Sequence, residues 1–299
     1  MKPTLLILAA GMASRYGSMK QIDGFGPNGE TIIDYSIYDA INAGFGKVVF
    51  IIKEEFVENF KSIFEPKLAG RIETDYVFQN FDLKQFGIEE EIYREKPWGT
   101  AHAILSGRKV INEPFCVINA DDFYGYDAYK KMVDFLNTEA TDSNYSIIGY
   151  QIGKTLSDFG SVSRGVCKVD ESGNLEEIIE RTKVYKKDET IVYEEDEKEY
   201  PLSFDTPVSM NFWGFTPAVF KITEDLFRTF ALENKDKPKA EFFIPLIGEN
   251  LVKTNTATFK VVPTSNQWFG VTYKEDKPFV QDCIDQLIKD GTYPEKLWS

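Results

Sequence analysis

The sequence contains 299 residues, which is enough for one large domain or two small ones with a sizeable core. Its 48 acidic and 34 basic residues give a net charge of −14 at pH 7. This balance argues against nucleic-acid binding and against attraction to anionic membranes, because both normally require a basic face.

The three cysteines are scattered singly, so their spacing indicates neither a zinc site nor a disulfide framework. The apolar run in the opening segment MKPTLLILAAG is too short for a signal peptide or a membrane-spanning helix. No other segment reaches membrane length. We therefore expect a cytoplasmic protein.

Strand and helix patterns alternate over the first 135 residues. The expected strands lie at 4–9, 47–52, 74–79 and 115–119, and the expected helices at 31–44, 54–65, 99–111 and from about 126. This alternation predicts a Rossmann-like α/β fold, with parallel strands and helices on both faces. Because ligands of such sheets bind beyond the carboxyl ends of strands, we single out two loops, at residues 8–20 and 120–122.

The second half of the chain has a different pattern. Its expected elements are strands at 145–152, 161–170, 174–181 and 208–215, helices at 217–234 and 239–252, a strand at 257–263 and a helix at 275–290. The run of strands predicts an antiparallel extension of the same sheet. The acidic stretch 188–199 is interpreted as a solvated hairpin or loop. Since no linker divides the chain, we expect a single domain over 1–299.

The loop after the first strand, LAAGMASRYGSMK (8–20), carries glycine and two cations. It matches neither the Walker pattern nor the dinucleotide fingerprint. A glycine at position 11 lets the backbone approach a triphosphate closely, and the small Ala10 leaves room for a nucleoside. Arg15 and Lys20 can neutralise phosphates, although each could also be a plain surface cation.

This stretch resembles the signature of the sugar-1-phosphate nucleotidyltransferases, the NDP-sugar pyrophosphorylases. Four further segments resemble motifs of that family in the same order, namely KPWGTAHAIL (96–105), FCVINADDFYG (115–125), SRGVCKVDESGNLEEIIER (163–181) and VSMNFWGFTP (208–217). Together the motifs extend over roughly residues 4–217. The resemblance implies a GT-A-like nucleotidyltransferase fold with a mixed, mostly parallel sheet.

The resemblance also implies roles for individual residues. Those that would bind the nucleotide are Leu8, Ala10, Gly11, Gly99 and Thr100. Arg15 would hold the leaving pyrophosphate, Lys20 would be the catalytic lysine, and Asp121 would bind Mg²⁺. The residues that would face the sugar phosphate are Gly165, Glu180 and Asn211. Residues 1–140 would then be the nucleotide-binding half and 141–255 the sugar-phosphate-binding half, followed by a C-terminal strand and helix at 256–299.

The implied reaction joins a nucleoside triphosphate, with UTP or dTTP favoured, to a sugar 1-phosphate and releases pyrophosphate. The attacking oxygen is already anionic, so no general base is needed, and Mg²⁺ and fixed cations offset the repulsion between the two polyanions. Other interpretations of single residues remain. Asp121 and Asp122 could cap the helix near 126, Glu180 could be an exposed acid, and His102 could be a core residue or a ligand contact.

The match has gaps. In many sugar pyrophosphorylases a late W-x-D-T-G segment supplies a second metal ligand, but here glycine 270 stands where that aspartate would be, and Asp276 is another acid that could help. The usual base-reading glutamine has no clear equivalent, and Arg94 falls near its position. Two alternatives therefore stay open: a cytidylyltransferase acting on phosphocholine or another phosphorylated small molecule, and a nucleotide-binding regulator with weakened catalysis. The oligomeric state is also left open.

Overall fold

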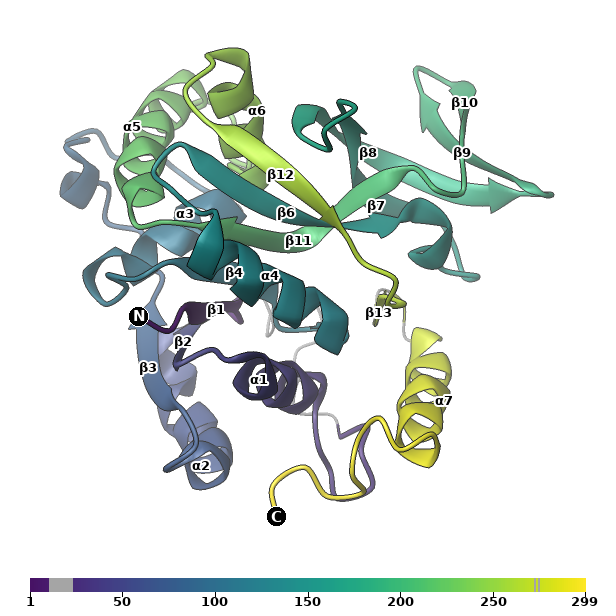
Figure 1. The fold of residues 1–299 in the computed structure, drawn as a ribbon. Coiled ribbons are helices and arrows are strands. Elements are labelled where there is room, and N and C mark those ends of the chain that lie inside the picture. Colours follow the sequence, from purple (N-terminus) through teal and green to yellow (C-terminus); the bar gives the residue numbers. More distant parts are fainter. Residues whose placement is uncertain (11–23, 272, 274) are drawn as a thin grey trace.

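The computed structural model describes residues 1–10, 24–271, 273 and 275–299. Within them, eleven strands form one mixed sheet (Figure 1). These strands are β1 (Thr4–Leu8), β2 (Lys47–Ile52), β3 (Glu73–Phe78), β4 (Phe115–Asn119), β6 (Asn144–Gln151), β7 (Val162–Val169), β8 (Leu175–Lys187), β9 (Thr190–Glu195), β10 (Lys198–Leu202), β11 (Pro207–Phe215) and β12 (Thr258–Pro263). Two short strands, β5 (Asp122–Phe123) and β13 (Phe269–Gly270), form a separate antiparallel pair.

The main run of the sheet has the order β10-β9-β8-β7-β11-β4-β1-β2-β3, and β6 and β12 branch from β11. Strands β4, β1, β2 and β3 are parallel to one another, as predicted from the alternation of strands and helices. The remaining pairings are antiparallel except that between β12 and β6. The predicted antiparallel extension is thus confirmed.

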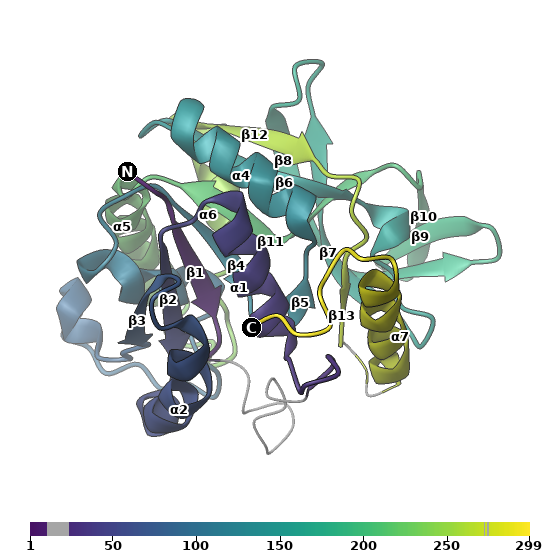
Figure 2. The same ribbon diagram turned by 60° about the horizontal axis from the view of Figure 1, so that its bottom comes forward.

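Helices cover both faces of this sheet (Figures 1 and 2). The helices on one face are α1 (Ile32–Ala43), α2 (Val57–Leu68) and α4 (Tyr126–Thr138), and those on the other are α3 (Thr100–Ile104), α5 (Ala218–Glu233) and α6 (Ile244–Lys253). Helix α7 (Asp276–Lys289) stands beside β13. The described residues also form short 3₁₀ helices, namely η2 (Glu54–Phe56), η3 (Leu83–Phe86), η4 (Leu105–Lys109) and η5 (Ile152–Lys154).

The all-apolar core strands explain why both faces are covered. Along β1, Leu5 and Ile7 enter the apolar cluster under α1 and α4, whereas Leu6 enters the cluster under α3 and α6. Successive side chains of a strand point to opposite faces, so a strand that is apolar at every position needs protein on both sides. A third apolar cluster packs α7 against β5 and β13.

Two predicted helices differ from the structure. The segment 99–111 forms only the short helix α3 followed by the 3₁₀ turn η4, which contains the poor helix former Gly107. The helix predicted at 239–252 begins only at Ile244. The residues just before it are not helical, because the backbone of Phe242 is bonded to the segment 98–101. The N–H of Phe242 donates to Trp98 O, and its carbonyl accepts from Ala101 N.

Strand β11 changes its neighbour partway along its length. Its beginning pairs with β7 through Val208 and Ser209, and its end pairs with β4 through Trp213 to Phe215. Between these stretches the register with β6 shifts, and Asn211 adopts the left-handed conformation with φ 63°. A bulge of this kind bends the strand and re-aims side chains.

The acidic stretch forms the antiparallel hairpin β9–β10, as one of the two interpretations predicted. Figures 1 and 2 show this hairpin projecting from one end of the sheet. The described part of the chain holds no helix with both the length and the apolar character needed to span a membrane.

Candidate active site

The carboxyl ends of β1 and β4 form one edge of the sheet. Leu8, the last residue of β1, pairs in register with Asn119, the last residue of β4. Beyond them lie Ala10 and Asp121, both partly buried. The structure therefore brings the predicted nucleotide-side residues Leu8 and Ala10 to the same edge as the predicted metal ligand Asp121. Gly11, Arg15 and Lys20 lie outside the described residues, so their roles stay predictions.

Gly99 and Thr100 begin helix α3, which packs beside β1. Gly99 has φ 101°, and a Cβ at this position would lie 2.6 Å from the carbonyl oxygen of Phe242. The Thr100 hydroxyl accepts a hydrogen bond from Ile244 N at 3.2 Å. The backbone of this turn is therefore fixed by close packing against 242–244, and only glycine fits at its start.

His102 points toward the end of β3. Gln79 follows that strand, and its Nε2 lies 2.9 Å from Nδ1 of the buried His102. The other ring nitrogen has no partner among the described residues. Burial first, and the charge of Arg108 second, lower the pKa of His102 to about 3, so the ring is neutral at pH 7. His102 is thus a core residue that holds Gln79.

Arg94 is tied to a neighbouring loop. Its guanidinium donates to the carbonyl oxygens of Lys237 (2.8 Å) and Ala240 and lies 3.9 Å from the ring centroid of Trp98. These contacts hold the Arg94 side chain between two loops, against the backbone of 237–240 and the ring of Trp98.

The predicted sugar-phosphate residues come from three adjacent strands. Gly165 in β7 lies opposite Glu180 in β8 and pairs on its other side with Ser209 in β11. A Cβ at Gly165 would lie 3.6 Å from Glu180 Oε2. Glu180 is exposed, yet partial desolvation raises its pKa, against the lowering effect of Arg164. Asn211 lies two residues beyond Ser209, at the bulge of β11.

A chain of hydrogen bonds joins this acceptor side to the end of β4. Asn211 Nδ2 donates to Asn119 Oδ1 (3.2 Å), and Asn119 Nδ2 donates to Asp122 Oδ2 (2.8 Å). The hydroxyl of Tyr124 accepts from Asn119 N (3.0 Å), donates to Met210 O (2.8 Å) and lies 3.3 Å from Asp122 Oδ2. The orientation of the Asn211 amide is therefore set by a residue on the neighbouring strand.

Asp122 is a buried acid within this chain of contacts. Burial, followed by the charge of Asp121, raises its pKa to about 7, whereas the hydrogen bond from Asn119 and the charge of Arg164 act in the opposite direction. Neither Asp121 nor Asp122 caps the following helix, because the N-cap of α4 is Gly125 and no side chain caps the helix. The helix-cap interpretation is therefore wrong for both residues.

Arg164 is a buried cation that interacts electrostatically with Asp122. Its guanidinium donates to Thr155 and lies 4.7 Å from the ring centroid of Trp268. Burial lowers its pKa to about 10, and three acids oppose this shift, in order of effect Asp122, Glu180 and Asp276. Arg164 therefore stays charged at pH 7 and balances part of the negative charge between the two sides of the site.

Mg²⁺ prefers oxygen donors and typically takes one or two carboxylates while it keeps several waters, so the carboxylate of the predicted ligand Asp121 is of a chemical type that fits a magnesium ion. No group of three or more His, Cys, Asp or Glu that could hold a metal occurs in the part of the chain that the structure describes. Asp276 is engaged elsewhere, since its two oxygens accept from Ser157 Oγ (2.9 Å) and Tyr273 N (2.6 Å).

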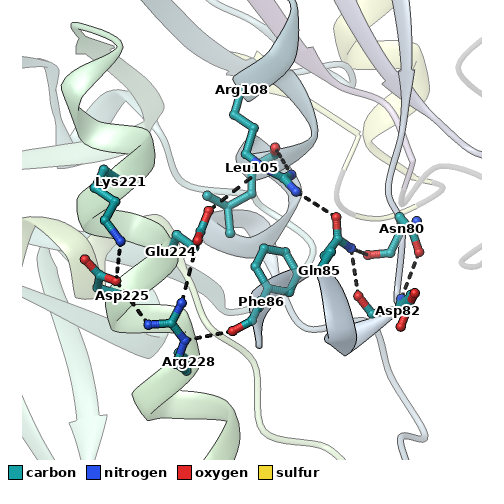
Figure 3. Close-up of polar contacts among 10 residues, drawn as sticks. All are labelled: Asn80, Asp82, Gln85, Phe86, Leu105, Arg108, Lys221, Glu224, Asp225 and Arg228. Atoms are coloured by element: carbon teal, nitrogen blue, oxygen red, sulfur yellow. Dashed lines mark hydrogen bonds and ion pairs between the residues drawn. The ribbon is translucent and has the colours of Figure 1, made fainter. Parts of the chain in front are cut away.

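A separate pocket of about 160 Å³ lies between η3 and η4, with His102 and Arg108 in its wall. Figure 3 shows that Arg108 is already engaged: it donates to Gln85 Oε1 (2.7 Å) and Leu105 O (2.6 Å) and approaches Glu224. Because its donors are used to tie η3, η4 and α5 together, Arg108 serves packing at this pocket rather than ligand binding.

Several residues of the site were not singled out from the sequence. They are Asn119, Arg164 and Tyr124. Asn119 ends an apolar strand, and a polar residue at the carboxyl end of a predicted parallel strand is a signal that could have identified it. Arg164 and Tyr124 gain their positions through tertiary contacts alone, so no local pattern marks them.

Comparison with known proteins gives a consistent result. The family model described as nucleotidyl transferase matches residues 6–242. Similar solved structures include the inositol-1-phosphate CTP transferase from T. maritima, with TM-score 0.64, 13% identity and coverage of 96% of this chain and 97% of that one. A UDP-glucose pyrophosphorylase complexed with UDP-glucose has TM-score 0.60 and 17% identity, covering 96% of this chain and 99% of its own.

HddC from Yersinia pseudotuberculosis is also similar, with TM-score 0.57, 16% identity and coverage of 94% of this chain and 99% of that chain. At these identities the structural matches establish the fold. The comparison with curated proteins found no significant match.

Proposed function

This chain belongs to the nucleotidyl transferase family, and we propose that it joins a nucleoside triphosphate to a sugar 1-phosphate, giving an NDP-sugar and pyrophosphate. UTP or dTTP is the favoured donor. Residues 1–140 form the nucleotide-binding half and residues 141–255 the half that binds the sugar phosphate, within a single domain over 1–299.

One observation carries this proposal. Asn211 on the acceptor side donates a hydrogen bond to Asn119, which ends the strand that leads into Asp121. The residues expected to bind a sugar phosphate and those expected to bind a nucleotide thus meet at one edge of the sheet. A transferase needs this arrangement, because both substrates must lie side by side for reaction.

In the proposed reaction an anionic oxygen of the sugar phosphate attacks the α-phosphorus of the triphosphate. The new oxygen–phosphorus bond forms as the bond between the α-phosphorus and the bridging oxygen breaks, and pyrophosphate carries away the electron pair. Asp121 would hold Mg²⁺, which would offset the negative charge of the phosphates. Lys20 supplies positive charge near the α-phosphate and Arg15 near the leaving pyrophosphate.

A panel of five nucleoside triphosphates, tested against several sugar 1-phosphates and phosphocholine, distinguishes the candidate functions. Pyrophosphate release with a sugar 1-phosphate and UTP or dTTP supports the proposal. Release with CTP and phosphocholine alone identifies the cytidylyltransferase alternative. Release with any pair excludes a purely regulatory nucleotide-binding protein, and no release with any pair contradicts the proposed activity.

A further inference from the structure

We propose that the pocket between η3 and η4 binds a small oxyanion, either inorganic phosphate or the phosphoryl group of a small phosphate ester. Its volume of about 160 Å³ is below the roughly 300–1,000 Å³ typical of sites for drug-sized ligands, so the pocket is too small for a whole nucleotide. The residues that line it are not among those expected to bind nucleotide, sugar phosphate or metal. A site here is therefore additional to the proposed active site and does not depend on the proposed function.

The polar groups in the wall of the pocket are mostly hydrogen-bond donors. Asn80 Oδ1 accepts from Asp82 N at 2.8 Å, which leaves the NH₂ group of Asn80 to donate. Ser106 and Lys109 also line the pocket, and neither side chain has a hydrogen bond or an ion pair with the described residues. An amide NH₂ group, a hydroxyl and an ammonium group together suit a ligand with several acceptor oxygens.

The buried ring of His102 supplies a further donor, which lacks an acceptor. Gln79 Nε2 donates to Nδ1 at 2.9 Å, so the proton of the neutral ring is on Nε2. His102 is 2% exposed and lines the pocket, and its Nε2 has no hydrogen-bond partner among the described residues. A buried N–H without a partner costs free energy, and an oxygen of a bound oxyanion would remove this cost by accepting from Nε2.

The charge of the wall favours an anion, although the whole chain carries −14. Arg108 and Lys109 line the pocket, and no acid does so among the described residues. Glu224 approaches Arg108 at 4.0 Å but does not line the pocket, and it also lies 3.7 Å from Arg228. The positive charge of the wall is therefore only partly offset by its surroundings.

The wall is fixed by its own hydrogen bonds. Gln85 Oε1 accepts from Arg108 at 2.7 Å, and Gln85 Nε2 donates to the carbonyl oxygens of Asn80 and Asp82, as Figure 3 shows. These bonds join η3 to η4 and hold the charge of Arg108 at a fixed position. Because these groups are already ordered, a ligand would bind with little loss of side-chain freedom.

The test follows the Nε2 nitrogen of His102 by NMR while the whole chain is titrated at pH 7 with inorganic phosphate and, separately, with glycerol phosphate. His102 is the only histidine of the chain, and burial lowers its pKa to about 3, so a shift cannot come from protonation of the ring. We expect a saturable shift of this signal with at least one of the two anions. The anion that binds more tightly identifies the source of the ligand, free phosphate or a phosphate ester.

Ser106→Ala and Lys109→Ala are each expected to raise the dissociation constant at least about fivefold, because each removes a donor to a charged ligand. The matched control is Lys221→Ala, which removes an exposed cation of α5 outside the pocket and should leave the dissociation constant unchanged. Lys20→Ala, at the expected nucleotide site, should also leave it unchanged, so phosphate bound at that site is distinguished from phosphate in the pocket.

Circular dichroism establishes that each variant is folded, and either pocket variant alone suffices for the comparison. The inference is overturned by a His102 signal that does not move with either anion up to about 10 mM. Equal dissociation constants in the wild type, Ser106→Ala and Lys109→Ala overturn it as well. An increase confined to Lys20→Ala would place the anion at the active site and would have the same consequence.

Discussion

The amide of Asn211 donates to the amide oxygen of Asn119 across 3.2 Å, at the point where β11 leaves β7 and joins β4. The bond uses one N–H of the NH₂ group, so the carbonyl oxygen and the second N–H of Asn211 remain to contact a ligand. Asn119 thereby orients the amide of Asn211.

We predict that Asn119→Ala raises KM for the acceptor substrate and lowers kcat/KM by about tenfold or more. The variant loses the bond to Asn211 and the bond to Asp122, and each is worth about 1 kcal/mol. Steady-state kinetics with the best substrate pair measures the effect. Asn112→Ala, in an exposed loop before β4, is the control. Unchanged kinetics in Asn119→Ala would show that the orientation of Asn211 is irrelevant.

Asp121→Ala and Lys20→Ala are each expected to lower turnover by at least about tenfold while the fold stays intact. The reason is electrostatic: each substitution removes a group proposed to hold or offset the charge of the phosphates. Turnover is measured by pyrophosphate release, and folding by thermal unfolding. Asp134→Ala serves as the control on an exposed helix face. Wild-type turnover in either active-site variant would refute its assignment.

Much of the fold follows from local patterns. The strands at 4–8, 47–52 and 115–119 are apolar at nearly every position, and this predicts burial on both faces of a parallel sheet. Thr31 and Gly44, a capping residue and a left-handed C-cap, bound α1 as their residue types predict. These features depend on short stretches of chain, so the sequence reveals them.

The site depends on contacts between distant segments and was predictable only in part. The bulge at Asn211 arises because β11 has two successive neighbours, and no residue type near 211 signals that change. Asp122 resembles a helix cap in the sequence, yet its pairing with Gly270, 148 positions further along the chain, makes it part of the short strand β5 instead. Motif resemblance identified positions at this edge, whereas the hydrogen bonds between them required the three-dimensional structure.

His102 is the only histidine of the chain, so one imidazole signal reports on it in an NMR titration. Its pKa is lowered to about 3, mainly by burial, so we expect the ring to stay neutral in the folded protein down to about pH 4. In the unfolded chain a histidine titrates near pH 6.5. The contribution of His102 to stability is therefore lost as the pH falls from about 6.5 toward 3. Protonation of the folded protein near pH 6.5 would contradict the burial of this ring.

Gly99→Ala is expected to destabilise the fold by about 2 kcal/mol or more, through both strain and collision. Its φ of 101° disfavours any side chain, and the new Cβ would lie 2.6 Å from a backbone oxygen of Phe242, which cannot rotate away. Chemical denaturation measures the loss in the free energy of unfolding. Gly291→Ala is the control, because φ is 74° there but nothing lies within 4 Å of the new Cβ. Equal losses in the two variants would show that the contact with Phe242 adds nothing.

Asp39 makes the free energy of unfolding depend on pH. Burial raises its pKa from 3.8 to about 7, although the hydrogen bond from Tyr293, with Oη 2.7 Å from Asp39 Oδ2, opposes the rise. Between these values the unfolded chain releases the proton and the folded chain keeps it, so stability falls as the pH rises from about 4 to about 7. A rise of this size corresponds to about 4 kcal/mol.

Asp39→Asn keeps an oxygen that can accept from Tyr293 but cannot ionise. We therefore expect this variant to be close to the wild type in stability at pH 4 and more stable than the wild type at pH 8, with the difference growing across the interval between. Urea denaturation at a series of pH values measures the two curves, and Asp290→Asn, on a solvent-exposed residue after α7, is the control. Parallel curves for wild type and Asp39→Asn would mean that Asp39 is ionised in the folded protein throughout this range.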